Sequence, residues 1–263
     1  VIDELTVNGK RVIFTMGKGG VGKTTVAAAV ALGLAKRGEK VHLATTDPAA
    51  HLKFVLDENC GIAMSHVDEA AELKKYQSEV LDKARASGMS NEDIAYIEED
   101  LHSPCTQEIA VFRAFAEIVD KADDQVVVID TAPTGHTLLL LESTQSYNHE
   151  IQRTKGEIPE SVIKLLPRLK SDETEVLIVT LPEATPVYEA LRLEEDLKRA
   201  GIAARWWIVD QSLYGTKTTN PILKAKAENE VEWLNRINEH ADGKFALIAW
   251  NAKDIKGERL LSL

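Results

Sequence analysis

A glycine-rich segment, residues 17–24, lies between a short apolar run and a long helical pattern. Residues 11–16 have the β-branched, uninterrupted apolar character of a buried parallel strand. The helical pattern extends to about Arg37, and Gly38 is its expected stop. A strand that joins a helix through a tight glycine turn is the repeating unit of α/β folds with a doubly wound sheet. The segment therefore predicts a fold of this class.

Five further apolar runs have the same character and alternate with amphipathic helical patterns. We expect each run to be a strand: residues 40–45, 125–130, 175–180, 203–210 and 244–248. Short buried strands separated by helices are typical of a mostly parallel sheet with helices on both faces. A length of 263 residues and an apolar content of 44% are sufficient for one such domain, over residues 1–263.

Two stretches interrupt this alternation. Residues 67–121 contain two or three charged helical patterns in succession with no strand between them, which predicts a helical insertion. Residues 147–172 contain Pro159 and Pro167 among mixed charges, which predicts a mobile connection with a short helix.

Charge and cysteine content limit the possible functions. The net charge of −11 opposes binding to phosphate backbones, so nucleic acid is not an expected partner. Cys60 and Cys105 form no C-x-x-C pair, which argues against a disulfide framework or a self-contained zinc site and fits a reducing cytosol. No apolar run reaches the length of a membrane span. Because the chain begins at Val1 and shows no secretion signal, we expect a cytoplasmic fragment of a longer protein.

The glycine-rich segment has the spacing G-x-x-x-x-G-K-[ST], which is that of a phosphate-binding loop. Its residues are Gly17, Lys18, Gly19, Gly20, Val21, Gly22, Lys23 and Thr24. The glycines allow main-chain N–H groups to turn towards phosphate oxygens, while Lys23 is expected to reach the β- and γ-phosphates and Thr24 to bind Mg²⁺. Thr25 is a further candidate nucleotide contact. The segment predicts a P-loop nucleotide hydrolase.

Two aspartates follow apolar runs at what the alternation predicts to be one edge of the sheet. Asp130 ends residues 125–130, and Asp47 follows residues 40–45. We expect Asp130 to hold Mg²⁺, in part through water, and Asp47 to help fix the metal and to orient the attacking water. The alternatives are a helix N-cap for Asp130 and a turn or cap residue for Asp47.

Lys18 adds a second cation to the loop, beyond the lysine that the basic motif requires. In this the segment resembles the deviant phosphate-binding loop of the nitrogenase iron protein, the division-site ATPases and the arsenical pump ATPases. The resemblance implies that Lys18 crosses a dimer interface and contacts the nucleotide of the opposite subunit, much as an arginine finger does. The alternative is an exposed lysine that pairs with a local acid.

Three segments carry a closer resemblance to the family of arsenical pump-driving ATPases. Residues 130–137 read D-T-A-P-T-G-H-T and resemble the family's switch motif, and residues 47–49 read D-P-A, as in its first switch. Residues 103–110, S-P-C-T-Q-E-I-A, resemble its metalloid-binding region. The resemblance extends over nearly the whole chain and is closest to the second of the family's two tandem halves.

This resemblance implies ATP hydrolysis that arsenite or antimonite stimulates and that energises a membrane efflux pump. The implied partners are a second ATPase half, the integral membrane pump and a metallochaperone, and the implied location is cytoplasmic, at the inner face of the cell membrane. Cys105, a soft thiolate, and His136 are the implied metalloid ligands, whereas Cys60 has a structural interpretation. Because As(III) prefers about three soft donors, we expect the partner half to complete the site.

One position departs from the family pattern. Asp210 and Gln211 stand where relatives carry an asparagine that reads adenine. A carboxylate only accepts hydrogen bonds and suits the N–H donors of guanine, whereas Gln211 can supply the donor that adenine needs. No Asn-Lys-x-Asp guanine motif is present, since residues 251–254 read N-A-K-D. We expect ATP as the nucleotide, with GTP as the alternative.

Three other functions share these motifs. A targeting ATPase for tail-anchored membrane proteins needs a broad apolar groove, often methionine-rich, and a zinc-bound C-x-x-C, whereas this chain has three methionines and no such pair. A partitioning or division-site ATPase needs a basic patch or a cationic amphipathic terminal helix, for which residues 254–263 are a weak candidate. A regulatory half that binds nucleotide without hydrolysing it is the non-enzymatic alternative.

Overall fold

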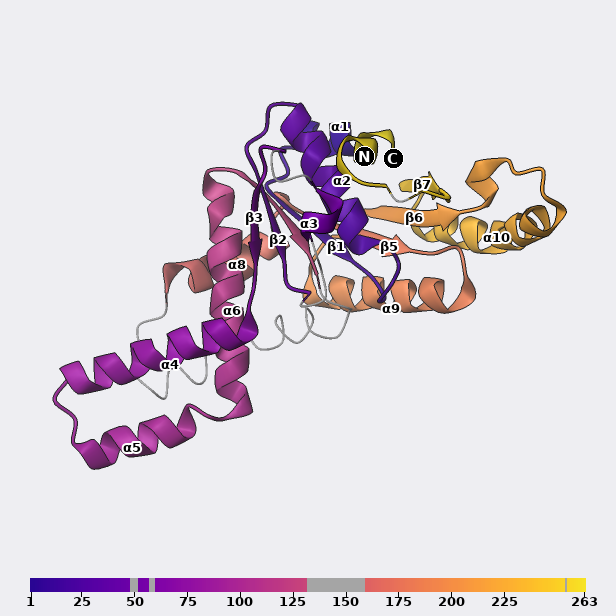
Figure 1. The fold of residues 1–263 in the computed structure, drawn as a ribbon. Helices are drawn as coiled ribbons and strands as arrows, with labels where there is room; N and C mark the ends of the chain where they lie inside the picture. Colours follow the sequence, from indigo (N-terminus) through magenta and orange to yellow (C-terminus); the bar gives the residue numbers. More distant parts are fainter. Residues whose placement is uncertain (48–51, 57–59, 132–158, 254) are drawn as a thin grey trace.

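The computed structural model describes residues 1–47, 52–56, 60–131, 159–253 and 255–263. Seven strands form one sheet in the order β3-β2-β4-β1-β5-β6-β7, and every neighbouring pair is parallel (Figure 1). The strands are β1 (Val12–Met16), β2 (Val41–Thr45), β3 (Ala63–His66), β4 (Val126–Asp130), β5 (Thr174–Thr180), β6 (Trp206–Ser212) and β7 (Phe245–Ala249). The predicted α/β fold with a parallel sheet is confirmed.

Side chains of the central strands alternate between two apolar layers, because successive residues of a strand point to opposite faces. In β1, Phe14 belongs to one layer and Ile13 to the other. The first layer includes α6 (Pro104–Asp120), α8 (Glu160–Lys170), α9 (Ala184–Ala200) and α10 (Pro221–His240). The second includes α1 (Ile2–Val7), α2 (Lys23–Lys36), α3 (Leu52–Val55) and the 3-10 helix η3 (Gly257–Ser262). Helices therefore cover both faces of the sheet.

Three helices occupy the interval that the sequence predicts to be a helical insertion. α4 (Glu69–Ala86) and α5 (Asn91–Asp100) form a hairpin that extends away from the sheet, and α6 follows them (Figure 1). Asp68, Ser90 and Ser103 are the N-caps, and each accepts a hydrogen bond from a main-chain N–H of the first turn. α5 buries no residue, whereas α6 buries Phe112 in the first apolar layer. The hairpin is thus peripheral, and α6 joins it to the core.

The six predicted strands are confirmed, with ends that differ by at most three residues. Strand β3 is not predicted from the sequence. It lies at the edge of the sheet, and its residues, which include Ser65 and His66, are partly or fully exposed. Main-chain pairing with β2 holds this strand, so it needs no continuous apolar run. The short helix predicted within residues 147–172 is α8; residues 147–158 lie outside the described ranges. None of the described helices has the length and apolar character that crossing a bilayer requires.

The order of the strands determines where a ligand can bind. β1 leads into α2 in the second apolar layer, whereas the next described helix after β4 is α8, in the first layer. Neighbouring parallel strands whose connections leave on opposite faces open a crevice at their carboxyl ends, and ligands of α/β proteins bind there. The carboxyl ends of β1 and β4 carry Gly17 and Asp130.

Candidate functional site

The phosphate-binding loop connects β1 to α2 and packs tightly on its neighbours. A Cβ atom on Gly17 would lie 2.1 Å from the carbonyl oxygen of Val179 in β5. A Cβ atom on Gly22, which has a φ of 93°, would lie 2.0 Å from Oδ2 of Asp210 in β6. Because the N-cap of α2 is Gly22, no N-cap side chain occupies the first N–H groups of the helix. These N–H groups can therefore turn to an anion.

Lys23 is the first residue of α2 and is only 5% exposed. Its Nζ donates a hydrogen bond to the main-chain carbonyl oxygen of Lys18, 3.0 Å away, so the side chain folds over the loop. Burial lowers the pKa of Lys23, and the nearby carboxylates of Asp130 and Asp47 oppose this shift. Phosphate oxygens are the ligands that best compensate such a buried ammonium. The other loop positions range from exposed (Gly19, Gly20) through half-buried (Thr24, Thr25) to buried (Val21).

Asp130 ends β4 and is fully buried beside the loop. Its Oδ2 accepts hydrogen bonds from Oγ1 of Thr24 at 2.7 Å and from Oγ1 of Thr45 at 3.3 Å. Its Oδ1 is buried and has no hydrogen-bond partner among the described residues. Burial raises the pKa of Asp130 to about 6, against the hydrogen bond from Thr24 and the charge of Lys23. One oxygen of this carboxylate therefore remains available to a ligand.

These groups fit a magnesium ion. Mg²⁺ prefers hard oxygen ligands such as carboxylates, hydroxyls and water. Because the Thr24 hydroxyl and the Asp130 carboxylate are 2.7 Å apart, both can join one coordination sphere, directly or through water. A cation at the open Oδ1 would also offset the free-energy cost of burying the carboxylate.

Asp47 lies next to this pair, just beyond β2. Its main-chain N–H donates to Oγ1 of Thr45 at 3.1 Å, and the same hydroxyl donates to Asp130. Its carboxylate acts electrostatically on both Lys23 and Asp130. The structure thus brings together the predicted residues Lys23, Thr24, Asp47 and Asp130. Pro48 and Ala49, which follow Asp47, lie outside the described residues.

Lys18 lies at the border of the loop and α9. Its Nζ is 3.5 Å from Oε1 of Glu189, and the two side chains are 38% and 43% exposed. Such a solvent-exposed ion pair contributes little free energy, so Lys18 can exchange this partner for another. In the single chain, Lys18 thus has the local acidic partner that the sequence analysis gives as the alternative.

A cavity of about 270 Å³ lies beyond the ends of β5, β6 and β7. Leu181, Gln211 and Trp250 contribute to its walls. Asp210 does not line this cavity: it is 7% exposed, its Oδ2 approaches Gly22, and its Oδ1 accepts a hydrogen bond from the main-chain N–H of Gln211 at 2.8 Å. Burial raises the pKa of Asp210. Of the two predicted base contacts, Gln211 lines the cavity and Asp210 lies against the loop.

The two predicted metalloid ligands are not brought together by the described structure. Cys105 is exposed in the first turn of α6, and His136 lies outside the described residues. The described ranges contain no group of three or more His, Cys, Asp or Glu residues that could hold a metal ion. Cys60 is partly buried against the second apolar layer.

Two contributors to the site are absent from the sequence analysis. Thr45 joins Asp47 to Asp130, and its signal is a hydroxyl at the last position of an apolar strand. Glu230 lies 4% exposed in α10 and binds the turn after Gln211. It stands in a strongly charged helical pattern, in which nothing distinguishes it from the solvent-exposed acids around it.

Fold and site together define the class of protein. A parallel α/β sheet places a glycine-rich loop before α2, and a buried acid from the neighbouring strand contacts the loop threonine. This is the architecture of a P-loop nucleotide-binding domain.

Comparison with known proteins places the chain within that class. It matches the model of the family described as Anion-transporting ATPase over residues 10–171 and 154–262. It is 41% identical to an arsenical pump-driving ATPase of Escherichia coli, over 98% of this chain and 44% of the relative. A protein of the same name from Acidiphilium multivorum is 42% identical, over 100% of this chain and 45% of the relative. ATPase GET3 of Paracoccidioides lutzii is 26% identical, over 99% of this chain and 90% of the relative.

The chain belongs to the anion-transporting ATPase family, as the resemblance to arsenical pump-driving ATPases predicts. It spans less than half the length of the two arsenical pump-driving relatives.

Proposed function

We propose that this chain is one ATPase half of a pump-driving protein, in which it binds and hydrolyses ATP with Mg²⁺. The observation that carries the proposal is the buried carboxylate of Asp130. One of its oxygens accepts from Thr24 of the loop, and the other has no hydrogen-bond partner among the described residues. A buried acceptor in that condition costs free energy unless a ligand satisfies it. The adjacent buried ammonium of Lys23 favours a polyphosphate as the companion ligand.

Different residues of the chain then have different roles in the reaction. N–H groups of the loop and Lys23 hold the phosphates and offset the negative charge that develops during transfer. Thr24 and Asp130 would hold a Mg²⁺ ion, which would supply further charge neutralisation. Asp47 orients a water molecule, whose oxygen forms a bond to the γ-phosphorus as the bond to the bridging oxygen breaks. The products are ADP and phosphate.

The base side of the site favours ATP. Gln211 lines the cavity beyond the loop, and its amide can accept from the adenine amino group and donate to N7. Asp210 lies against Gly22, so its carboxylate is less suited to a direct contact with guanine. GTP is the alternative nucleotide.

A second ATPase half is part of the proposal. Among the described residues, the ammonium of Lys18 pairs with the exposed Glu189, and a facing nucleotide can replace this partner. In a complex of two halves, Lys18 would reach the nucleotide of the other half and add positive charge to its transition state.

Arsenite or antimonite is the proposed activator, and a membrane efflux pump the proposed partner of the assembled protein. Cys105 would supply one soft thiolate from its exposed position on α6, His136 would act with it, and the other half would complete the ligand set. A metallochaperone is a further proposed partner. The assembled protein would then act in the cytoplasm, at the inner face of the cell membrane.

Nucleotide hydrolysis by the intact protein tests this function. Phosphate release is measured with ATP and with GTP, with and without antimonite, for the unchanged protein, Cys105→Ala and the matched control Cys60→Ala. We expect antimonite to stimulate ATP hydrolysis in the unchanged protein and in Cys60→Ala, and to have no effect in Cys105→Ala. ATP turnover that is indifferent to antimonite would contradict metalloid gating and favour the targeting or division-site ATPases. Nucleotide binding without turnover would favour a regulatory half.

A further inference from the structure

The end of β6 is irregular where it carries Asp210 and Gln211. β6 pairs with β7 at Val209↔Leu247 and again at Ser212↔Ala249, so β6 uses one residue more than β7 between these points. The extra residue makes a β-bulge, and Gln211 has a φ of 57°, in the left-handed region that residues other than glycine seldom adopt. Bulges redirect the side chains beside them. Here Asp210 approaches the phosphate loop, while Gln211 lines the cavity.

The carboxylate of Glu230 in α10 binds the turn that follows the bulge. Its Oε2 accepts hydrogen bonds from Oγ of Ser212 at 2.8 Å and from the N–H of Tyr214 at 3.0 Å. Its Oε1 accepts from the N–H of Leu213 at 3.1 Å. Glu230 is 4% exposed, and a carboxylate this deeply buried is tolerated when several donors satisfy it. The turn is therefore fastened to α10 through both carboxylate oxygens.

These hydrogen bonds hold Gln211 from one side, and Asp210 holds it from the other. Upstream, the N–H of Gln211 donates to Oδ1 of Asp210 at 2.8 Å. Downstream, Ser212 is bound to Glu230 and also accepts from the N–H of Gly215 at 3.4 Å. A left-handed residue outside glycine persists only where its surroundings impose it. Glu230, which lines the same cavity as Gln211, is the group that makes the downstream part of this restraint.

We infer that Glu230 is a positioning residue for recognition of the nucleotide base, because it holds Gln211 at the wall of the cavity through the turn from Ser212 to Tyr214. The inference deepens the proposed function and rests on it. The turn fixes the main chain of Gln211, and the carboxylate of Asp210 interacts with its side-chain amide, so the amide presents its donor and acceptor in one order, which suits adenine. Once the turn is loosened, the amide can adopt either order, and discrimination between adenine and guanine falls.

Substitution of Glu230 should leave binding of the nucleotide phosphates unchanged. The loop residues Lys23 and Thr24 are bound to Lys18 and Asp130, whereas the hydrogen bonds of Glu230 go to Ser212, Leu213 and Tyr214. Inorganic tripolyphosphate, which has the charge and oxygens of the ATP phosphates without the base, therefore separates the two parts of the site.

Calorimetric titration of the full chain tests the inference with Glu230→Gln, in which an NH2 group, which cannot accept from N–H, replaces one acceptor oxygen of the carboxylate. The ligands are ATP, GTP and tripolyphosphate, each with Mg²⁺. We expect the affinity for ATP to fall about tenfold and the ratio of ATP to GTP affinity to approach one. The affinity for tripolyphosphate should stay within about twofold. Glu228→Gln, an exposed substitution on the same helix, is the matched control and should change none of the three affinities.

Ser212→Ala removes one donor to Glu230 without altering α10, and it carries the test if Glu230→Gln does not fold. It should show the same pattern at about threefold. Equal losses for ATP and tripolyphosphate would mean a purely structural role and overturn the inference. So would unchanged ATP affinity and unchanged selectivity in both variants. An unchanged chain that binds none of the three ligands would overturn the proposed function, and this inference with it.

Discussion

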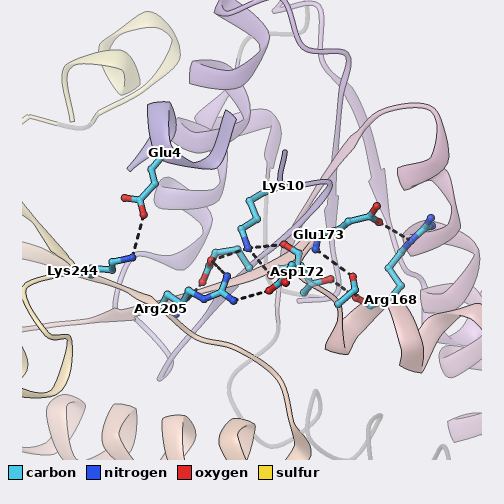
Figure 2. A network of polar contacts seen from close by, with 10 residues as sticks. Glu4, Lys10, Arg168, Asp172, Glu173, Arg205 and Lys244 are labelled. Atoms are coloured by element: carbon cyan, nitrogen blue, oxygen red, sulfur yellow. Dashed lines mark hydrogen bonds and ion pairs between the residues drawn. The ribbon is translucent and has the colours of Figure 1, made fainter. Parts of the chain in front are cut away.

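The two edges of the central sheet use buried charge in opposite ways. At the carboxyl edge, Lys23 and Asp130 are buried, and Oδ1 of Asp130 has no hydrogen-bond partner among the described residues. At the amino edge, Lys10 and Glu175 are also buried, and the charged groups of both have partners. Figure 2 shows Lys10 within these contacts. The charged groups of Lys10 and Glu175 are 3.4 Å apart, and Lys10 also donates to main-chain carbonyl oxygens at 2.7 and 3.3 Å.

Further charged groups near the amino ends of β5, β6 and β7 are also paired. Oε1 of Glu175 accepts from the main-chain N–H of Arg205 at 2.9 Å, and the guanidinium of Arg205 binds Asp172 at 2.9 Å. Lys244 and Glu4 form a further pair at 3.2 Å (Figure 2). The amino edge of the sheet therefore carries buried charges that have partners, whereas at the carboxyl edge one buried carboxylate oxygen has none among the described residues. We expect charge at the amino edge to act on stability and charge at the carboxyl edge to act on ligand binding.

Lys23→Ala should show the largest effect and should act on activity alone. With the other ATPase half of the intact protein inactivated, we expect ATP hydrolysis to fall about 1,000-fold, which corresponds to about 4 kcal/mol of lost transition-state stabilisation. The free energy of unfolding should stay the same or rise, because a buried ammonium is removed. Phosphate release and urea unfolding measure the two quantities.

The matched control for Lys23→Ala is Lys36→Ala, at the other end of α2. Lys36 is 54% exposed and pairs with Glu258, so its loss should leave hydrolysis unchanged. Retention of more than about a tenth of the activity in Lys23→Ala would contradict the assignment of the carboxyl edge.

Lys10→Met should lower the free energy of unfolding and leave ATP hydrolysis unchanged, which is the reverse of the expectation for Lys23→Ala. Methionine replaces the aliphatic stem of the lysine but lacks the ammonium, so Glu175 loses its closest cation, and breaking one side of a buried pair costs about 3 kcal/mol. Urea unfolding measures this loss, and ATP turnover by the folded protein should be unchanged. Lys244→Met, which breaks a pair 47% and 38% exposed, is the control and should cost less than about 1 kcal/mol. Equal losses in both variants would disprove the role of burial.

His42 should make the free energy of unfolding of the protein sensitive to acid. It lies in β2, 6% exposed, with Nε2 2.8 Å from Oγ of Ser65. Burial lowers the pKa of His42 to about 4, and the charge of Lys121 adds to this. Since the unfolded chain binds the proton near pH 6.5, the contribution of neutral His42 to stability is complete above that pH. It is lost as the pH falls to about 4, by about 3 kcal/mol.

Unfolding by urea between pH 7 and pH 4 checks this dependence. His42→Gln should show a shallower loss of stability than the unchanged protein over this range. His240→Gln, at a side chain 47% exposed, should follow the unchanged protein. Parallel curves for the unchanged protein and His42→Gln would exclude His42 as the source.

More residues can be predicted from the sequence at the carboxyl edge of the sheet than at the amino edge. The loop, Asp47 and Asp130 are recognisable because the chemistry requires them at set places: consecutive loop positions and the ends of apolar strands. The amino-edge pairs Lys10–Glu175 and Glu4–Lys244 each join residues far apart along the chain, and no local pattern connects them. Glu230 cannot be predicted from the sequence for the same reason, because its hydrogen-bond partners lie at least 16 residues away along the chain.

Edge strands and bulges escape prediction for a different reason. β3 is held by main-chain pairing to β2, so its side chains carry no apolar signature. The bulge in β6 depends on its pairing with β7, which the sequence of β6 alone does not encode.

The proposed function makes one claim about Asp130: its Oδ1, which has no hydrogen-bond partner among the described residues, holds Mg²⁺ together with the nucleotide phosphates. ATP affinity is measured by calorimetry in excess Mg²⁺ and in excess chelator, for the unchanged chain and for Asp130→Asn. We expect Mg²⁺ to strengthen ATP binding at least about tenfold in the unchanged chain and less than about twofold in Asp130→Asn, because an amide binds the cation poorly. An equal gain from Mg²⁺ in both proteins would contradict the claim.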